Sequence, residues 1–115
     1  MPRSRTTRKT TPAQQLLRKI DRRSAHLGVI GLGYVGLPLA VEFGQAGYRV
    51  SGLDIDERRV SRLRRGRSYV QDVPSAHVQE LVRSGMFQPT TDFGVLRHLD
   101  AVIVCVPTPL SKQRD

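Results

Sequence analysis

Residues 27–40 read LGVIGLGYVGLPLA and contain a short apolar run, three spaced glycines and the start of a second apolar pattern. The first run, Leu27 to Ile30, is too short for a helix and rich in β-branched residues, which predicts a buried strand. Beyond the glycines, apolar residues recur at three- and four-residue steps, which predicts a helix. These residues are Val35, Leu39, Ala40, Phe43 and Ala46. The stretch therefore predicts a strand, a tight turn and a helix.

The three glycines, Gly31, Gly33 and Gly36, have the G-x-G-x-x-G spacing. In this motif the first glycine allows the tight turn, the second lets the backbone approach a pyrophosphate, and the third packs the helix against the strand. Backbone N–H groups and the positive end of the helix dipole then favour a bound phosphate. The spacing alone is weak evidence, because three glycines occur by chance in many loops.

An acidic residue after the next predicted strand adds the context that the glycines need. Residues 48–53 form an apolar stretch, and Asp54 follows it, 21 residues after Gly33. An acid about 20 residues beyond the glycines accepts hydrogen bonds from the adenosine ribose in dinucleotide-binding folds. Arg59 lies one helical turn further on, where an arginine can indicate the 2′-phosphate of NADP. Because the charge of Asp54 would repel that phosphate, the sequence favours NAD.

The rest of the chain alternates predicted helices and strands. Helices are predicted from Thr11, as its cap, to about Arg23, from Asp56, as its cap, to about Arg65 and over 75–84, and a short helical turn over 92–99. Residues 87–91 predict a weak strand that Pro89 restricts to an edge, and the apolar run 101–106 predicts a central parallel strand. The predicted class is α/β, a Rossmann-type doubly wound parallel sheet of which the N-terminal part, about four strands, is present.

The positive charge is concentrated near the N-terminus. The chain of 115 residues has a formal net charge of +9, of which residues 1–26 carry +7 and residues 27–115 carry +2. We therefore predict a basic N-terminal arm over 1–26 and a cofactor-binding domain over 27–115. The arm contains a short helix, which we expect to pack on the domain or on a partner subunit. A transit peptide would share the composition of residues 1–10, but a solvated tail is the preferred interpretation of them.

The composition and the residue spacing disfavour several classes of protein. The arm lacks aromatic residues and a recognised binding motif, so no nucleic-acid partner is expected. No apolar run is long enough to span a membrane, and a cytoplasmic location is expected. The three histidines show no metal-ligand spacing, so no metal site is expected. Cys105, the single cysteine, lies in an apolar run and is interpreted as a buried core residue.

Several separated motifs resemble the N-terminal domain of the UDP-glucose/GDP-mannose dehydrogenases. They are residues 31–40, GLGYVGLPLA; residues 52–56, GLDID; and residues 105–110, CVPTPL. The leading helix and two further stretches, SYVQDVPS at 68–75 and TTDF at 90–93, resemble the branch that acts on UDP-N-acetylhexosamines. The resemblance covers about residues 16–115.

This resemblance implies an NAD-dependent enzyme that oxidises the C6 alcohol of a UDP-sugar to a carboxylate in two steps. It implies that Tyr34 and Val35 offer N–H groups to the pyrophosphate and that Asp54 holds the adenosine ribose. It also implies that Arg59 flanks the adenine end and that Thr108 contacts the cofactor. The catalytic cysteine and lysine and the substrate-binding domain of the family lie beyond residue 115. No catalytic residue is therefore expected within this chain.

We expect from these observations that the chain is a fragment, poorly stable and inactive alone, and that the full-length protein is a homo-oligomer. A stand-alone module that binds NAD without turnover remains an alternative, as does another Rossmann dehydrogenase with a different hydroxyl substrate. A nucleic-acid-binding protein led by the basic arm is a further alternative, which steep salt dependence of binding would reveal. Which UDP-sugar is used is left open.

Overall fold

The computed structural model describes residues 11–105 as a parallel sheet with helices packed around it. The helices are α1 (Pro12–Asp21), α2 (Gly36–Gln45), α3 (Glu57–Arg64) and α4 (Ser75–Ser84), with a 3₁₀ helix η1 (Phe93–His98). The strands are β2 (His26–Ile30), β3 (Arg49–Leu53), β4 (Phe87–Thr90) and β5 (Ala101–Val104). Each predicted helix and strand is present, with ends within about two residues of the expected positions.

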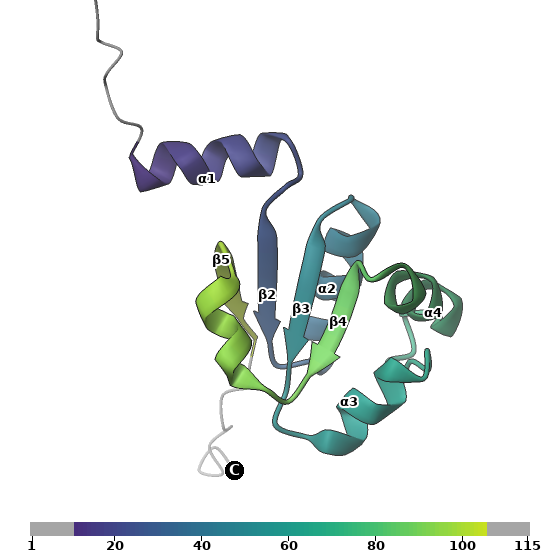
Figure 1. Ribbon diagram of the computed structural model, residues 1–115. Helices are drawn as coiled ribbons and strands as arrows, with labels where there is room; N and C mark the ends of the chain where they lie inside the picture. The colour runs from purple at the N-terminus through teal and green to yellow at the C-terminus, as the bar shows by residue number, and fades with distance from the viewer. Residues whose placement is uncertain (1–10, 106–115) are drawn as a thin grey trace, which may run out of the picture.

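The sheet has the order β4-β3-β2-β5, and every neighbouring pair is parallel (Figure 1). In chain order this is third, second, first, fourth, which is the first part of the classic Rossmann order. The α/β Rossmann-type prediction is confirmed. The direction of strand succession reverses between β2 and β5, and ligands of such sheets bind at the carboxyl ends of the strands beside this reversal.

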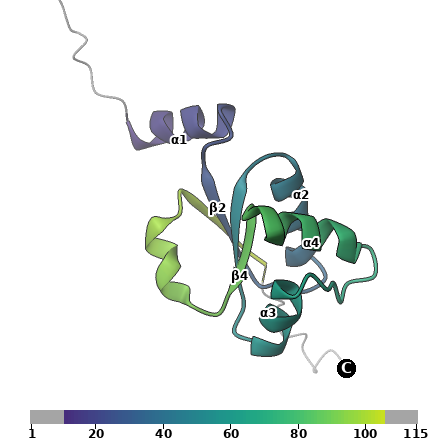
Figure 2. The same cartoon turned by 45° about the vertical axis from the view of Figure 1, so that its right-hand side comes forward.

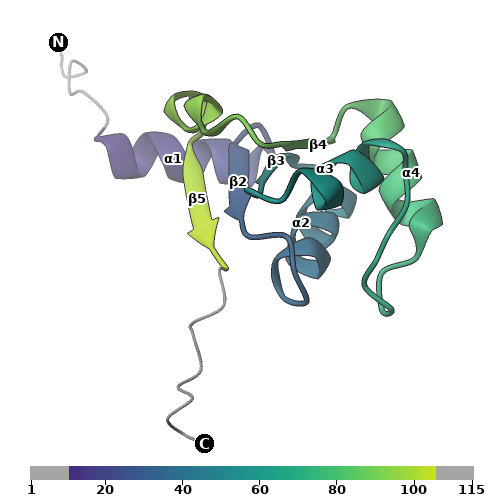
Figure 3. The same cartoon turned by 90° about the horizontal axis from the view of Figure 1, so that it is seen from below.

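The hydrophobic core lies between one face of the sheet and the helices α2, α3 and α4 (Figure 3). On this face Val50 of β3 is in register with Leu27 of β2 and with Phe87 of β4, and all three are buried. Leu32 and Leu37, from the glycine turn and the start of α2, are also fully buried. Each such side chain contributes roughly 1.5–3 kcal/mol on burial, so the core holds the glycine turn against the sheet.

The buried face of α2 coincides only in part with the apolar pattern from which the helix was predicted. Ala40 is buried and Phe43 packs against the core, but Val35 is 66% exposed and Ala46 is exposed. The buried face consists of Gly36, Leu37, Ala40, Val41 and Gly44. Val35 precedes the helix, so the apolar face follows the spacing that starts at Leu37.

The strand β5 is an edge of the described sheet rather than the predicted central strand. It pairs with β2 on one side only, and its residues alternate between half-buried and exposed, with Val104 62% exposed. The continuous apolar run indicated burial on both faces, but no element of residues 11–105 covers the exposed face of Val102 and Val104. Cys105, expected to be buried, is half-buried and packs against the edge of the core.

Helix α1 stands apart at the amino ends of the strands (Figures 1 and 2). It begins with the predicted cap, in which the Thr11 hydroxyl accepts the N–H of Gln14 and the Gln14 side chain accepts the N–H of Thr11. It buries no residue. An ion pair from Lys19 to Asp100 (2.7 Å) and a hydrogen bond from the Tyr48 hydroxyl to the Ile20 carbonyl oxygen (2.8 Å) hold it to the domain. Helix α1 therefore contacts the domain, and the contacts are these two polar interactions.

Candidate nucleotide-binding site

The glycine turn between β2 and α2 is shaped by close backbone contacts. Gly31 has a φ of 93°, a conformation that side chains rarely adopt, and its N–H donates to the Leu53 carbonyl oxygen at 2.8 Å. A methyl group on Gly36 would overlap the carbonyl oxygen of Gly31, so α2 starts directly against the end of β2. A methyl group on Gly33 would meet only the Arg59 side chain, at 3.7 Å. Gly33 thus leaves an open approach to the backbone.

The start of α2 is open to an anion. Val35 at the N-cap makes no side-chain hydrogen bond, and the first turn contains no acidic residue. Within residues 11–105, no acceptor takes the N–H groups of Tyr34, Val35 or Gly36. Tyr34 and Val35 are 87% and 66% exposed, so these two residues lie at the surface, whereas Gly36 is buried. Free N–H groups and the positive end of a helix dipole are the elements from which proteins build phosphate sites.

The Asp54 carboxylate lies beside this turn, at the end of β3. Its Oδ2 accepts the Leu32 N–H at 2.8 Å and a guanidinium N–H of Arg59 at 3.2 Å, and its Oδ1 accepts the Asp56 N–H at 2.9 Å. Burial alone would raise the pKa of Asp54, but the hydrogen bonds from Leu32, Asp56 and Arg59 outweigh it, so the pKa lies below its usual value. The group is therefore an ionised acceptor, and Oδ1 retains capacity for a further donor.

Arg59 is held over Asp54 by several partners at once. It pairs with Asp54 and, at 3.9 Å, with Asp56, and its guanidinium carbon lies 5.8 Å from the centroid of the Tyr69 ring. Asp56 also caps α3, accepting the N–H of Arg58 at 2.9 Å, so the helix start that carries Arg59 is fixed. The arginine shields a carboxylate that is only 6% exposed.

Tyr69 is a component of this site that was not among the predicted cofactor residues. It lies in the loop between α3 and α4, and its hydroxyl donates to the Leu32 carbonyl oxygen at 2.6 Å. Burial raises the pKa of Tyr69, so its hydroxyl stays protonated and remains a donor. No periodicity or spacing connects a loop tyrosine to a turn 37 residues earlier. Only the resemblance of the segment 68–75 to a family motif singled it out.

The structure brings together seven of the eight predicted cofactor residues. The glycine turn supplies five of them, and Asp54 and Arg59 lie against it through Leu32 and Gly33. The five are Gly31, Gly33, Tyr34, Val35 and Gly36. Thr108, the eighth, lies outside the described residues. Cys105 approaches the turn from β5, with its N–H bonded to the Ile30 carbonyl oxygen at 2.7 Å and its Cβ facing Gly36. The point between β2 and β5 where the strand order reverses therefore lies beside the glycine turn.

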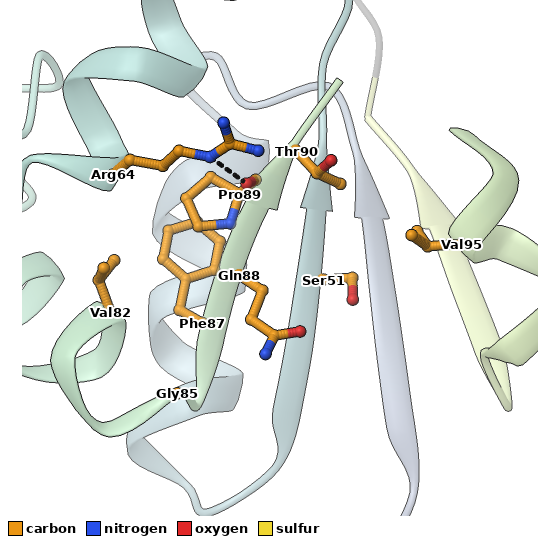
Figure 4. Close-up of a pocket in the computed structure, with 9 residues that line it drawn as sticks. All are labelled: Ser51, Arg64, Val82, Gly85, Phe87, Gln88, Pro89, Thr90 and Val95. Atoms are coloured by element: carbon orange, nitrogen blue, oxygen red, sulfur yellow. Dashed lines mark hydrogen bonds between the residues drawn. The ribbon is translucent and has the colours of Figure 1, made fainter. Parts of the chain in front are cut away.

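A hollow of about 400 Å³ lies elsewhere, across the edge strand β4 (Figure 4). It is lined by Ser51, Arg64, Val82, Gly85, Phe87, Gln88, Pro89, Thr90 and Val95. Arg64 is its one charged residue, and its Nε donates to the Pro89 carbonyl oxygen at 3.1 Å. This bond, together with the missing N–H of Pro89, blunts the sheet edge. None of the predicted cofactor residues lines the hollow, and its lining offers no paired acid and base.

Residues 11–105 contain no cluster of three or more histidine, cysteine or acidic side chains that could hold a metal ion. In the same range, no helix is long and apolar enough to cross a membrane.

Comparison with known proteins identifies the domain. Residues 25–115 match the model of the UDP-glucose/GDP-mannose dehydrogenase family, NAD binding domain. The chain is 39% identical over 88 residues to UDP-N-acetyl-D-glucosamine 6-dehydrogenase of Pseudomonas aeruginosa, a match that covers 76% of this chain and 20% of the relative. It is 34% identical over 89 residues to UDP-N-acetyl-D-mannosamine dehydrogenase of Salmonella typhi, covering 77% and 21% of the two chains.

A solved structure agrees with the sequence matches. The NDP-N-acetyl-D-galactosaminuronic acid dehydrogenase of Methanosarcina mazei superposes with a TM-score of 0.74 at 28% identity, covering 93% of this chain and 24% of that one. The present chain thus spans about a fifth of the length of the curated relatives that it matches.

Proposed function

This chain belongs to the UDP-glucose/GDP-mannose dehydrogenase family, and we propose that its glycine turn, Asp54 and Arg59 form the NAD site of a nucleotide-sugar dehydrogenase. The observation that carries the proposal is the meeting of free N–H groups at the start of α2 with an ionised Asp54 beside them. N–H groups that can bind an anion lie beside a carboxylate that can accept hydrogen bonds from hydroxyls. This pair fits the pyrophosphate and the adenosine ribose of NAD.

Each residue has a separate task in this proposal. The N–H groups of Tyr34 and Val35 bind the pyrophosphate, which approaches over Gly33 because no side chain stands in the way. The Asp54 carboxylate accepts the ribose hydroxyls, and Arg59 flanks the adenine end. Thr108, which lies outside the described residues, also contacts the cofactor in this proposal. The bound NAD supplies a hydride acceptor for the substrate.

The substrate in the proposal is a UDP-N-acetylhexosamine whose C6 alcohol is oxidised to the carboxylate in two NAD-dependent steps. Relatives named for both the glucosamine and the mannosamine sugars support this class without separating its members. We also propose the division into an arm over 1–26 and an NAD-binding domain over 27–115. A cytoplasmic location and self-association of the full-length protein complete the proposal.

The direct test is calorimetric titration of the chain with NAD. Asp54→Asn should weaken binding by at least about tenfold, because hydrogen bonds to a charged group contribute roughly 1.5–3 kcal/mol. Asp100→Asn is the control at the opposite end of the sheet, since Asp100, like Asp54, combines a hydrogen bond from a backbone N–H, that of His26 at 2.8 Å, with a cation, Lys19. Its NAD affinity should equal that of the unchanged chain. Equal losses in both variants would contradict the assignment of Asp54.

A second assay addresses the substrate. The protein that contains this domain should form two NADH for each UDP-N-acetylhexosamine oxidised, and UDP-glucose should be a poorer substrate. NADH formation with UDP-glucose alone would contradict the assignment of the sugar class while leaving the NAD site in place.

A further inference from the structure

Tyr69 makes two contacts that both end at the proposed NAD site. Its hydroxyl donates to the Leu32 carbonyl oxygen at 2.6 Å, and its ring face lies under the guanidinium of Arg59, 5.8 Å from the centroid. On α3, Arg62 also approaches the ring at 5.8 Å, and its guanidinium donates to the Ser68 carbonyl oxygen at 3.2 Å. The loop that carries Tyr69 is thus fastened to the same helix as Arg59.

The hydroxyl contact fixes the direction of a backbone N–H. Leu32 is held on both sides, because Asp54 accepts its N–H and Tyr69 donates to its carbonyl oxygen. In a planar trans peptide the carbonyl oxygen and the following N–H point in opposite directions. Anchoring the Leu32 oxygen toward Tyr69 therefore turns the Gly33 N–H away from it, and Gly33 is the residue that leaves the approach to the turn open.

The ring contact limits where Arg59 can go. The guanidinium contacts the Tyr69 ring at 5.8 Å from its centroid, the Asp54 carboxylate at 3.2 Å and the Asp56 carboxylate at 3.9 Å. A cation held on an aromatic face gains about 0.5–1 kcal/mol at an exposed site. Arg59 in this position is paired with carboxylates and is not free to bind a 2′-phosphate.

We propose that Tyr69 is a positioning residue of the NAD site, whose hydroxyl fixes the Leu32–Gly33 peptide that leads to the Tyr34 and Val35 N–H groups and whose ring keeps Arg59 beside Asp54, so that NAD is preferred over NADP. The inference rests on the proposed function, because it assumes that NAD occupies the glycine turn. The two parts of the Tyr69 side chain have separate effects. The hydroxyl acts on the affinity for both dinucleotides, and the ring acts on the selectivity for NAD over NADP.

The test compares Tyr69→Phe, Tyr69→Leu and Tyr48→Phe in the full chain, by calorimetric titration with NAD and with NADP. Tyr69→Phe keeps the ring and should weaken both dinucleotides by roughly threefold to tenfold, the effect of one lost hydrogen bond, with an unchanged NADP-to-NAD ratio of dissociation constants. Tyr69→Leu should show the same weakening, and the ratio should fall by about twofold to fivefold as Arg59 is released. Adding Arg59→Met to Tyr69→Leu should abolish the fall in that ratio.

Tyr48→Phe is the matched control, because the Tyr48 hydroxyl also donates to a backbone carbonyl oxygen, that of Ile20, but at the far end of the sheet. It should leave both dissociation constants unchanged. A ratio that changes in Tyr69→Leu but not in Tyr69→Phe is a result that mere loss of stability would not produce.

The outcomes separate the two proposals. If the unchanged chain binds NAD and Tyr69→Phe binds it equally well, this inference is overturned and the NAD site stands. An unchanged NADP-to-NAD ratio in Tyr69→Leu would overturn the role of the ring. If the unchanged chain binds no NAD, the proposed function is overturned, and this inference with it.

Discussion

Gly31, Gly33 and Gly36 differ in what surrounds the position of a missing side chain. Gly31 needs its positive φ for the turn, and Gly36 leaves no room for a methyl group against the Gly31 carbonyl oxygen. Gly33 has neither restriction, since only a flexible arginine side chain lies near it. Two of the glycines thus serve the fold, and Gly33 is left for the ligand.

This difference predicts opposite results for two alanine substitutions. Gly36→Ala should lower the free energy of unfolding by about 3 kcal/mol or more, because backbone must move to relieve the overlap. Gly33→Ala should change it by no more than about 1 kcal/mol, yet should lose most of the NAD affinity, since its methyl group blocks the approach to the backbone. Urea unfolding and NAD titration of each variant check both. Normal NAD binding by Gly33→Ala would contradict the proposed path of the pyrophosphate.

Among the elements, α1 differs from the others in how it is attached. The helices α2, α3 and α4 each bury apolar residues in the core, whereas α1 buries none and is held by the Lys19–Asp100 pair and the Tyr48–Ile20 hydrogen bond. The Lys19 side chain is about half exposed, so water screens much of the attraction in that pair. The domain does not depend on this helix for its core.

Removal of residues 1–22 should therefore lower the free energy of unfolding by no more than about 2 kcal/mol, the sum expected for one exposed ion pair and one hydrogen bond. Urea unfolding gives this value. The double variant Lys19→Met, Tyr48→Phe removes the two contacts without shortening the chain and should reproduce most of the loss. Failure of the shortened chain to fold would contradict both this estimate and the proposed division near residue 26.

At the scale of the whole molecule, the shifted groups act together on stability. The pKa of His26 is lowered mainly by burial, with the charge of Arg49 adding to it. The pKa of Asp100 is lowered by the His26 N–H and then by Lys19, and that of Asp54 is also lowered, against the effect of burial. For all three, the unfolded chain binds protons more readily than the folded one. The pKa of Tyr69 is raised by burial, so there the unfolded chain loses its proton first.

The free energy of unfolding should consequently be largest between about pH 6.5 and pH 10, the usual pKa values of histidine and tyrosine. On acidification it should fall first as His26 is protonated in the unfolded state, and again below about pH 4 as the carboxylates are protonated. Urea unfolding across the pH range measures this profile. Asp54→Asn should flatten the fall below pH 4, and Tyr69→Phe should flatten the fall above pH 10. An unchanged alkaline fall in Tyr69→Phe would contradict the burial of that hydroxyl.

Local patterns were sufficient to predict the order of helices and strands, the glycine turn, the caps at Thr11 and Asp56 and the edge position of β4. These features depend on residues a few positions apart, whose periodicity, turn chemistry and missing N–H groups are visible in the chain itself. Asp54 was predictable for the same reason, because the length of one strand–helix–strand unit fixes its distance from Gly33.

The tertiary structure alone decided which side chains from distant segments meet. It brought Tyr69 to Leu32, set Lys19 of α1 against Asp100 before β5, and left Val104 exposed despite its apolar run. Such contacts depend on how the loop 68–74 approaches the glycine turn, where Tyr69 reaches Leu32, and on which faces neighbouring elements cover. Periodicity along the chain carries no information on either, since it reports which face of an element is apolar and not what will lie against it.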